Sequence, residues 1–421
     1  MPPRNRTAPY QYPRSRKNRV LLSRGPSADA LTVAGSVFEI EKWLHDGTRL
    51  TDLSLPLHGR MSYNWKRLEN ALTDLLLFVL AENVRITPAA PLEPPKKLRH
   101  EPSIPQADRI CLFSGGVDSL SGILAAHSAL GNLQGVFCAH SDQSRIITIV
   151  DQLAAAAFTP LGLTLREISV PSVGIRGYAQ LRGFLYCVAA AAWMYMVNAR
   201  SLIVTECGPT MYQPMFSPLD SVTMTTHPVV LRHAKTVIET ILGRPITLLT
   251  PFEDFTKAEV MAICPRPDLI PQTHSCISQR FGSHDGTCFG CVIRRLAGIA
   301  AGIPDVEYSR DPISDESAAA GNLLSLFTYC HDLLTAYGSM EQFEIAKIER
   351  YRKHDLFQRF ALDQFAAIHD LLTRKQRVRP AIVRMYDNVV AAVGVFALEA
   401  RLHALRSFDV RIEWHRTPPI T

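Results

Sequence analysis

Between Arg109 and Leu249, short apolar runs alternate with longer stretches in which apolar residues recur every three or four positions. Short apolar runs predict buried strands, and longer periodic stretches predict helices. The predicted strands are Ile110–Phe113, Gly135–Cys138, Thr164–Ile168, Leu202–Thr205 and Ile246–Leu249. The predicted helices are Asp118–Leu130, Arg145–Leu161, Tyr178–Asn198 and Pro228–Leu242. This alternation predicts an α/β fold with a doubly wound parallel sheet, which binds ligands at the carboxyl ends of its strands.

Regions of a different pattern flank this α/β domain. Leu68–Val79 shows a helical period, the prolines of residues 86–106 indicate a linker, and the pattern after Pro312 is helical to about Leu405. We therefore divide the chain into a disordered basic tail (1–19), an N-terminal extension (20–95), the α/β domain (107–305) and a helical C-terminal domain (311–421).

The net charge of +6 is concentrated at the amino end. Residues 1–25 contain seven basic residues and no acidic residue, which leaves −1 for the remainder of the chain. A near-neutral body excludes a protein that coats nucleic acid with a basic folded face, although nucleic-acid binding by the tail stays open. With 47% hydrophobic and 20% charged residues, the chain can bury a large core.

Membrane and secretion signals are not evident in the sequence. The longest uncharged apolar run, Phe184–Val197, is shorter than the roughly 20 residues that a membrane span needs. Residues 1–25 lack the apolar region of a signal peptide. Nine cysteines, three of them clustered, suit a reducing compartment and a metal site better than a disulfide framework. We therefore expect a cytoplasmic protein without a membrane partner.

The segment after the first predicted strand has the composition of a phosphate loop. Its residues are Ser114-Gly115-Gly116-Val117-Asp118-Ser119, and a predicted helix follows. The glycines allow a tight turn close to an anion, and the helix start offers free N–H groups. The segment lacks the lysine of the G-x-x-x-x-G-K-[ST] loop and is not G-x-G-x-x-G. The alternative is an ordinary strand–turn–helix junction in which Asp118 caps the helix.

Three cysteines form a second candidate site. Cys288 and Cys291 lie two residues apart beyond a turn glycine, and Cys276 lies upstream. Thiolates with this spacing can bind one zinc ion, which requires a fourth ligand. The alternative is three unrelated buried thiols.

The loop is similar to the SGGxDS loop of the PP-loop ATP pyrophosphatases, whose fold is adenine nucleotide alpha hydrolase-like. The resemblance implies that ATP and Mg²⁺ bind here, with Asp118 acting through the metal ion. It also implies that Lys257, in a segment resembling the late T-P-x-x-x-x-x-K motif, stabilises the departing pyrophosphate; the alternative is a surface lysine that opens a helix. The implied nucleotide-binding residues are Phe113, Ser114, Gly115, Gly116, Val117, Asp118 and Ser119.

Together, the loop and the cysteines resemble the QueC family of 7-cyano-7-deazaguanine synthases, in which a four-cysteine zinc site follows the ATP domain. The family's remaining cysteine falls at Asp285, so Asp285 or His284 is the favoured fourth ligand, with His274 and Cys264 as alternatives. Arg182 lies where the family has an arginine entering a helix, and a structural salt bridge is its alternative role. The implied reaction adenylates 7-carboxy-7-deazaguanine and transfers the acyl group to ammonia.

The chain is about twice as long as ordinary synthases, and Thr205–Gly208 and Met224–Pro228 replace their standard segments. In layout it is similar to the QatC-type, defence-associated branch of this family. That resemblance implies an ATP-dependent ligase in anti-phage defence, with partner proteins from a defence operon and a protein amine as acceptor. Thr226 and His227 either line the pocket or cap the next helix. A housekeeping synthase of queuosine biosynthesis and a non-catalytic nucleotide-binding scaffold are the alternatives.

Overall fold

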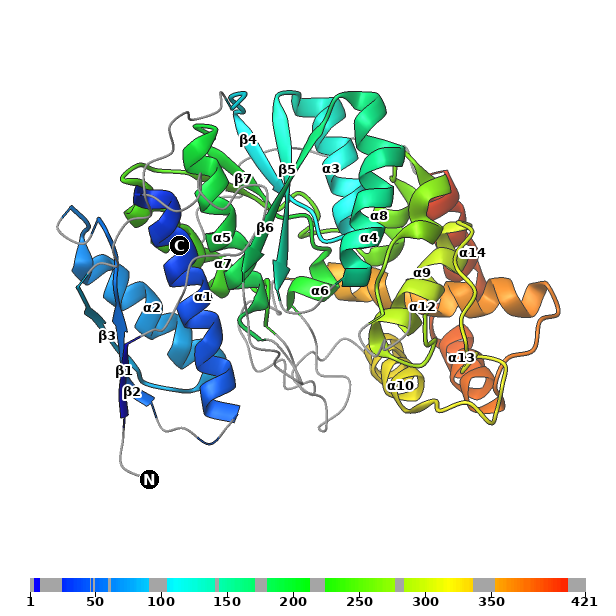
Figure 1. The fold of residues 1–421 in the computed structure, drawn as a ribbon. Coiled ribbons are helices and arrows are strands. Elements are labelled where there is room, and N and C mark those ends of the chain that lie inside the picture. Colours follow the sequence, from blue (N-terminus) through cyan, green and yellow to red (C-terminus); the bar gives the residue numbers. More distant parts are fainter. Residues whose placement is uncertain are drawn as a thin grey trace.

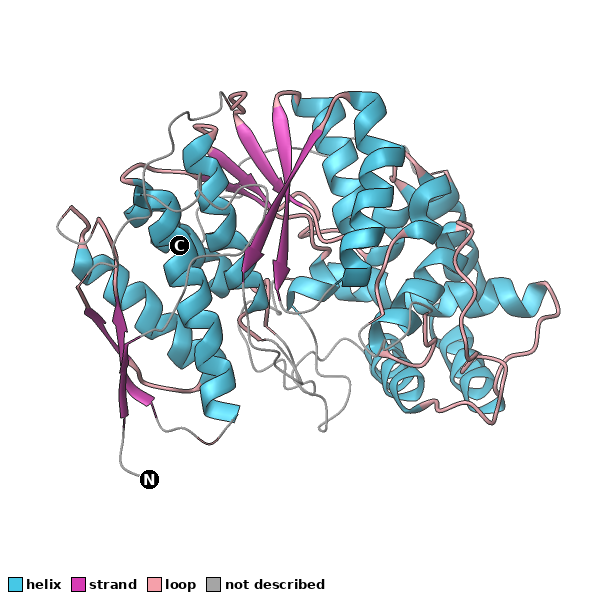
Figure 2. Ribbon diagram, viewed as in Figure 1, coloured by secondary structure: helices cyan, strands magenta, loops and turns pink. Residues whose placement is uncertain are grey.

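The computed structural model of the chain contains two separate parallel sheets surrounded by helices (Figures 1 and 2). It describes residues 4–7, 25–45, 47, 50–59, 62–90, 104–140, 144–170, 180–212, 224–276, 284–335 and 353–407. The apolar core is continuous across all the regions, since buried side chains from Ala30 to Leu405 belong to one cluster.

The larger sheet has five strands, at the positions that the sequence predicts. They are β4 (Arg109–Leu112), β5 (Leu133–His140), β6 (Thr164–Val170), β7 (Ser201–Ile203) and β8 (Thr247–Leu249). All neighbours pair in parallel, in the order β6-β5-β4-β7-β8. The α/β class and its parallel sheet are therefore confirmed.

The order of strands reverses at β4. The chain runs from β4 to β5 and β6 on one side, then returns to add β7 and β8 on the other. Ligands bind in such sheets beyond the carboxyl ends of the strands at this reversal. The segments that follow β4 and β7 are therefore expected to form the site.

Helices cover both faces of this sheet, with α5 and α7 on one side and α3 and α4 on the other (Figure 1). The helices of the α/β domain are α3 (Val117–Leu130), α4 (Ser144–Leu153), α5 (Arg182–Met196), α6 (Gly208–Tyr212), α7 (Pro228–Leu242), α8 (Lys257–Ala262) and α9 (Phe289–Ala301). The predicted helix Arg145–Leu161 continues beyond α4 as a π-helical turn and a 3-10 turn. Pro160 lies in the 3-10 turn, where its missing N–H prevents a regular helix from continuing.

The N-terminal extension forms the smaller sheet and two helices. Its elements are β1 (Arg4–Thr7), α1 (Gly25–His45), β2 (Leu50–Leu55), α2 (Trp65–Leu80) and β3 (Arg85–Pro88). The expectation that the whole tail is disordered is wrong for residues 4–7, because their backbone pairs in parallel with the open edge of β2. The strand β3 also occupies the start of the predicted linker, whose residues 91–103 lie outside the described residues.

The C-terminal region is helical, as predicted. Its described helices are α10 (Gly321–Thr335), α12 (His354–Thr373), α13 (Pro380–Val393) and α14 (Val395–Arg406). The helix α12 packs on α9 and α14, and α14 contacts α8 and α9, so this region rests directly on the α/β domain. Among the described helices none is both long and apolar enough to cross a membrane alone, although α13 and α14, bent by 97°, pass by length and composition when taken together.

Candidate nucleotide site and cysteine cluster

The loop between β4 and α3 has the backbone of an anion cradle. Gly115 has a φ of +79°, which only glycine adopts without strain, and a Cβ there would lie 3.1 Å from a methyl carbon of Val150. Gly116 is the N-cap residue of α3 and, as a glycine, has no side chain with which to cap the first turn. The free N–H groups of that turn can therefore bind phosphate oxygens.

Serine hydroxyls hold the loop in this shape. The hydroxyl of Ser119 donates to the carbonyl of Gly116 at 2.9 Å and accepts from the amide of Ser114 at 3.2 Å. Outside the loop, the amide of His274 donates to the carbonyl of Gly115 at 2.9 Å. Because these bonds are already made, the loop is ordered before any ligand arrives.

Two of the predicted nucleotide-binding residues have their side chains in the core. Phe113 is buried against Phe158, with ring centroids 4.8 Å apart, and Val117 is also buried. Only the backbone of these two residues can therefore contact a ligand. Ser114 is exposed at the mouth of the loop.

Asp118 lies beneath the loop and does not cap the helix, so the alternative prediction for this residue is wrong. Its side chain is buried, and its Oδ2 atom accepts from Lys257 Nζ at 2.6 Å and from the amide of Cys207 at 3.2 Å. Its Oδ1 atom has no hydrogen-bond partner among the described residues. A buried carboxylate oxygen with no partner fits a cation ligand.

Lys257 is brought to Asp118 by the start of α8. Its side chain is 15% exposed, so the alternative of a surface lysine is wrong. Burial acts to lower the pKa of Lys257, but the adjacent Asp118 carboxylate raises the pKa above its ordinary value. The ammonium group therefore stays charged and can stabilise negative charge in the site.

Glu206 is a further member of this cluster that sequence reasoning did not identify. It follows β7 at the reversal point of the sheet. Burial and then the negative charge of Asp118 raise the pKa of Glu206, while Lys257 and Arg182 lower it. The signal in the sequence is an acidic residue just beyond a strand at the reversal point.

Arg182 begins α5 at the same edge of the sheet. Burial raises the pKa of both Glu206 and Glu41, and Arg182 is close enough to oppose this rise in both carboxyl groups. Glu41, from the N-terminal helix α1, accepts from the amides of Gln180 and Leu181 at 2.6 and 3.1 Å. The N-terminal extension therefore holds the start of the helix that carries Arg182.

Cys207 does not have the properties of a nucleophile. It is buried, and burial followed by the charge of Asp118 raises its pKa to about 12. Its Sγ atom lies 3.2 Å from the hydroxyl of Thr210. A thiol with this pKa is protonated at neutral pH, and the thiolate is the nucleophilic form of cysteine.

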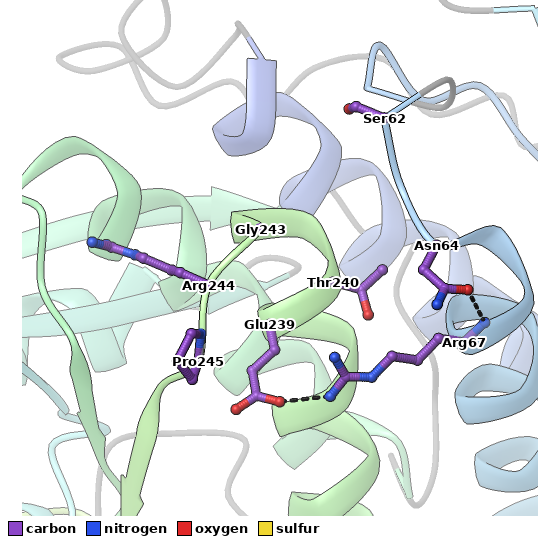
Figure 3. A pocket seen from close by; sticks show the side chains of 8 residues that line it. All are labelled: Ser62, Asn64, Arg67, Glu239, Thr240, Gly243, Arg244 and Pro245. Atoms are coloured by element: carbon purple, nitrogen blue, oxygen red, sulfur yellow. Dashed lines mark hydrogen bonds and ion pairs between the residues drawn. The ribbon is translucent and has the colours of Figure 1, made fainter.

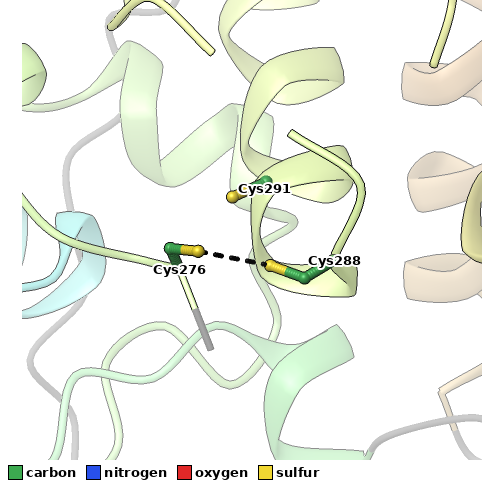
Figure 4. Close-up of side chains that lie close together, drawn as sticks. All are labelled: Cys276, Cys288 and Cys291. Carbon is green, nitrogen blue, oxygen red and sulfur yellow. Dashed lines mark hydrogen bonds between the residues drawn. The ribbon is translucent and has the colours of Figure 1, made fainter. Parts of the chain in front are cut away.

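The three predicted cysteine ligands form a cluster (Figure 4). Cys276, Cys288 and Cys291 are buried, and their Sγ atoms all lie within 4.8 Å of one another. Cys288 is the N-cap residue of α9 and Cys291 lies in its first turn. Gly286 turns the chain into this helix with a φ of +92°, and a Cβ there would lie 2.0 Å from the carbonyl oxygen of Arg310. The prediction of three unrelated thiols is therefore wrong, and the cluster could hold a metal ion such as zinc.

The predicted fourth ligands make other hydrogen bonds. Asp285 Oδ1 accepts from the amide of Thr287 at 2.8 Å and from its hydroxyl. The Nε2 atom of His284 lies 3.4 Å from the amide of Ser275 and 3.3 Å from a guanidinium nitrogen of Arg294. Among the described residues, these three cysteines form the only group of three or more His, Cys, Asp or Glu residues whose ligand atoms all lie within 4.8 Å of one another. The bonds of Asp285 Oδ1 and His284 Nε2 leave the other ligand atom of each side chain, Oδ2 or Nδ1, as the candidate fourth ligand.

A cavity of about 370 Å³ between the N-terminal extension and the α/β domain is a weaker candidate (Figure 3). It adjoins the turn before β8, at the amino ends of the strands, so it lies at the edge opposite the phosphate loop. Its Arg67 pairs with Glu239 at 2.7 Å, and its Arg244 donates to the carbonyl of Ala199 at 2.9 Å. Both cations are thus engaged within the protein.

Comparison with known proteins gives no identification. No family model matches the chain, and no curated protein matches it. Function is therefore inferred from the residues of the two sites.

Proposed function

We propose that this protein is a QueC-like, ATP-dependent ligase that adenylates a carboxylate, releases pyrophosphate and passes the acyl group to an amine. The observation that carries the proposal is the buried pair of Asp118 and Lys257 directly below the uncapped start of α3. A helix start, a charged lysine and an open carboxylate oxygen match the three needs of a triphosphate bound with Mg²⁺.

Each group has a distinct part in the proposed chemistry. The N–H groups of α3 bind the phosphates, and Lys257 stabilises the charge that develops on departing pyrophosphate. Asp118 Oδ1 would hold Mg²⁺, which when bound neutralises phosphate charge. Arg182 binds the carboxylate or a phosphate from the other side of the crevice.

Adenylation needs no nucleophile from the protein. A carboxylate is a poor electrophile, and attached AMP gives it a leaving group that an amine can displace. The protein then has to align the reactants and stabilise phosphate charge. The high pKa of Cys207 agrees with such a mechanism, because no thiolate takes part.

The resemblance to QueC suggests 7-carboxy-7-deazaguanine as the carboxylate, and the layout of the chain suggests the defence-associated, QatC-type branch. In that setting the acceptor is an amine of a protein partner. The N-terminal extension and the C-terminal helices are additions large enough to bind such a partner.

Zinc is the metal that we propose for the cysteine cluster. Three thiolates are soft ligands, which favour zinc over Mg²⁺ or Ca²⁺. The cluster lies two residues beyond His274, whose amide bonds the phosphate loop. A bound zinc ion would therefore support the loop rather than take part in the reaction.

The test is to incubate the protein with ATP, Mg²⁺ and 7-carboxy-7-deazaguanine and to follow pyrophosphate release and product mass. The Lys257→Met variant should lose most of the pyrophosphate release, whereas the control Lys235→Met, which removes a pair with Glu239 away from the loop, should keep it. A nitrile formed from ammonia would favour the housekeeping synthase. A mass increase on a co-expressed protein would support the ligase. ATP binding without pyrophosphate release would favour the scaffold.

A further inference from the structure

We propose that the C-terminal helices set the position of Lys257, with Arg359 and Arg401 acting as positioning residues. This inference rests on the role proposed above for Lys257. It assigns to the C-terminal region a part in the nucleotide site, although none of its side chains needs to touch the nucleotide.

A capping box formed by Thr256 and Glu259 starts α8. The amide of Glu259 donates to the Thr256 hydroxyl at 3.3 Å, and Glu259 Oε2 accepts from the amide of Thr256 at 2.8 Å. Lys257 is the first residue of this six-residue helix. Because so short a helix has little stability of its own, its cap determines where the helix begins and therefore where Lys257 lies.

The other oxygen of the Glu259 carboxylate contacts the C-terminal helices. Glu259 Oε1 accepts from Arg401 of α14 at 2.7 Å and from Arg359 of α12. Arg401 also bonds Asp363 of α12 at 2.6 Å. One glutamate thus joins the cap of α8 to two helices that lie 100 and 142 residues further along the chain.

Burial makes this connection matter. The side chain of Glu259 is 2% exposed and that of Asp363 is 1% exposed, and the two arginines balance their charges. A buried carboxylate that loses its cationic partners is strongly destabilised. The carboxylate of Glu259 therefore has its cationic partners only while α12 and α14 are in place.

A separate set of contacts holds the segment that leads into α8. Lys353, the N-cap residue of α12, pairs with Glu253 at 3.1 Å and with Asp254 at 2.6 Å. Arg359 also donates to the carbonyl of Asp254 at 2.8 Å. The C-terminal region therefore contacts both the approach to α8 and its cap.

The geometry of the site depends on these contacts because Lys257 Nζ lies only 2.6 Å from Asp118 Oδ2. A displacement of about 1 Å in a charge-stabilising group can cost roughly 100-fold in rate. Loosening α8 should therefore lower the turnover number for pyrophosphate release, with little change in KM for the carboxylate substrate.

The experiment compares Arg401→Met with Arg406→Met. Arg406 lies on the same helix and bonds Asp370 of α12 at 2.7 Å and the carbonyl of Ile299 of α9, with no hydrogen bond to α8. We measure hydrogen exchange of the α8 amides, thermal stability and the kinetics of pyrophosphate release. Arg401→Met should speed exchange in residues 256–262 and lower kcat by roughly 10- to 100-fold, and Arg406→Met should do neither.

A double variant separates positioning from general destabilisation. In the Lys257→Met background, adding Arg401→Met should lower the remaining rate by less than about threefold, because the group that it positions is absent. Arg359→Met serves as a second variant if Arg401→Met does not fold, and Arg401→Lys should recover part of kcat.

Equal losses of kcat in Arg401→Met and Arg406→Met, or the same fold-loss in the Lys257→Met background, would overturn the positioning role. If the unaltered protein releases no pyrophosphate, the proposed function fails, but hydrogen exchange still decides the inference. Unchanged exchange of residues 256–262 in both Arg359→Met and Arg401→Met would then refute it.

Discussion

The amide of His274 donates a 2.9 Å hydrogen bond to the carbonyl of Gly115, so the chain segment that leads to Cys276 is bonded to the loop between β4 and α3. Buried Arg294 holds the same segment in place, since its guanidinium donates to the carbonyls of Ile270 and Thr273 at 2.7 Å each. A change at the cluster should therefore reach the loop through only two residues of backbone.

Removal of the metal should weaken nucleotide binding. We expect Cys288→Ser to lose bound zinc, measured by elemental mass spectrometry, and to bind ATP more weakly, measured by calorimetry, because the segment that carries His274 loses its anchor. The control is Cys330→Ser, which alters a buried cysteine of α10 outside the cluster. Full zinc content in Cys288→Ser would contradict the assignment of the cluster.

Breaking the pair of Asp118 and Lys257 should cost stability as well as activity. Either Asp118→Asn or Lys257→Met should lower the rate of pyrophosphate release by roughly 100- to 1000-fold, and Lys257→Met should also lower the free energy of unfolding by about 3–5 kcal/mol because it leaves a buried charge unpaired. The double variant should be more stable than Lys257→Met, since neither charge then remains. Urea denaturation measures this difference, and a double variant less stable than Lys257→Met would contradict the account.

A pair of glycines that flank α3, Gly115 and Gly131, separates backbone strain from site geometry. Gly115→Ala and Gly131→Ala each place a side chain at positive φ, which costs about 1–3 kcal/mol. Gly115 lies in the phosphate loop, whereas a Cβ at Gly131 meets nothing within 4 Å. We expect both variants to lose stability in denaturation, and only Gly115→Ala to lose ATP affinity; equal affinities would show that the loop does not bind phosphate.

The buried charges beneath α8 predict a dependence of stability on pH. Burial raises the pKa of Asp363 from 3.8 to about 6, and Arg401 opposes this shift, while the charge of Glu259 adds to it. The folded state therefore binds the proton more tightly than the unfolded state. The stability that this group contributes is present below pH 4 and is lost as the pH rises through about 6.

The Asp363→Asn variant isolates this effect. The difference in unfolding free energy between the unaltered protein and the variant should fall by on the order of 3 kcal/mol between pH 4 and pH 7. Denaturation curves across this range measure it. A difference that is constant with pH would mean that Asp363 is ionised throughout.

Most of the larger sheet was predictable because strands such as β4 coincide with short apolar runs, for example Ile110–Phe113, which favour burial in the core. The smaller sheet was not predictable from the sequence. Its strands carry polar residues at Thr51, Asp52 and Thr87 and lack a continuous apolar run, so their pairing depends on contacts between distant segments.

The candidate sites also contain some residues that the sequence predicts and others that it does not. Short motifs predicted the strand–loop–helix segment of residues 110–130 and the clustering of the three cysteines, because groups close in sequence fix their own spacing. The partner of Asp118 was expected only as a separate lysine, and the contacts of Glu259 with Arg359 and Arg401 leave no local pattern. Glu206 was missed because a single acidic residue after a strand is common in sequences and gains meaning only from the order of the strands.

The boundary between the α/β domain and the C-terminal helices divides a balanced set of charges between three elements. The helix α8 supplies Glu259, α12 supplies Arg359 and Asp363, and α14 supplies Arg401. A chimaera that joined this α/β domain to the C-terminal helices of a relative without both arginines would bury an acid with no counterion. The two parts can therefore be exchanged between proteins only together, and during evolution they are expected to be inherited as one unit.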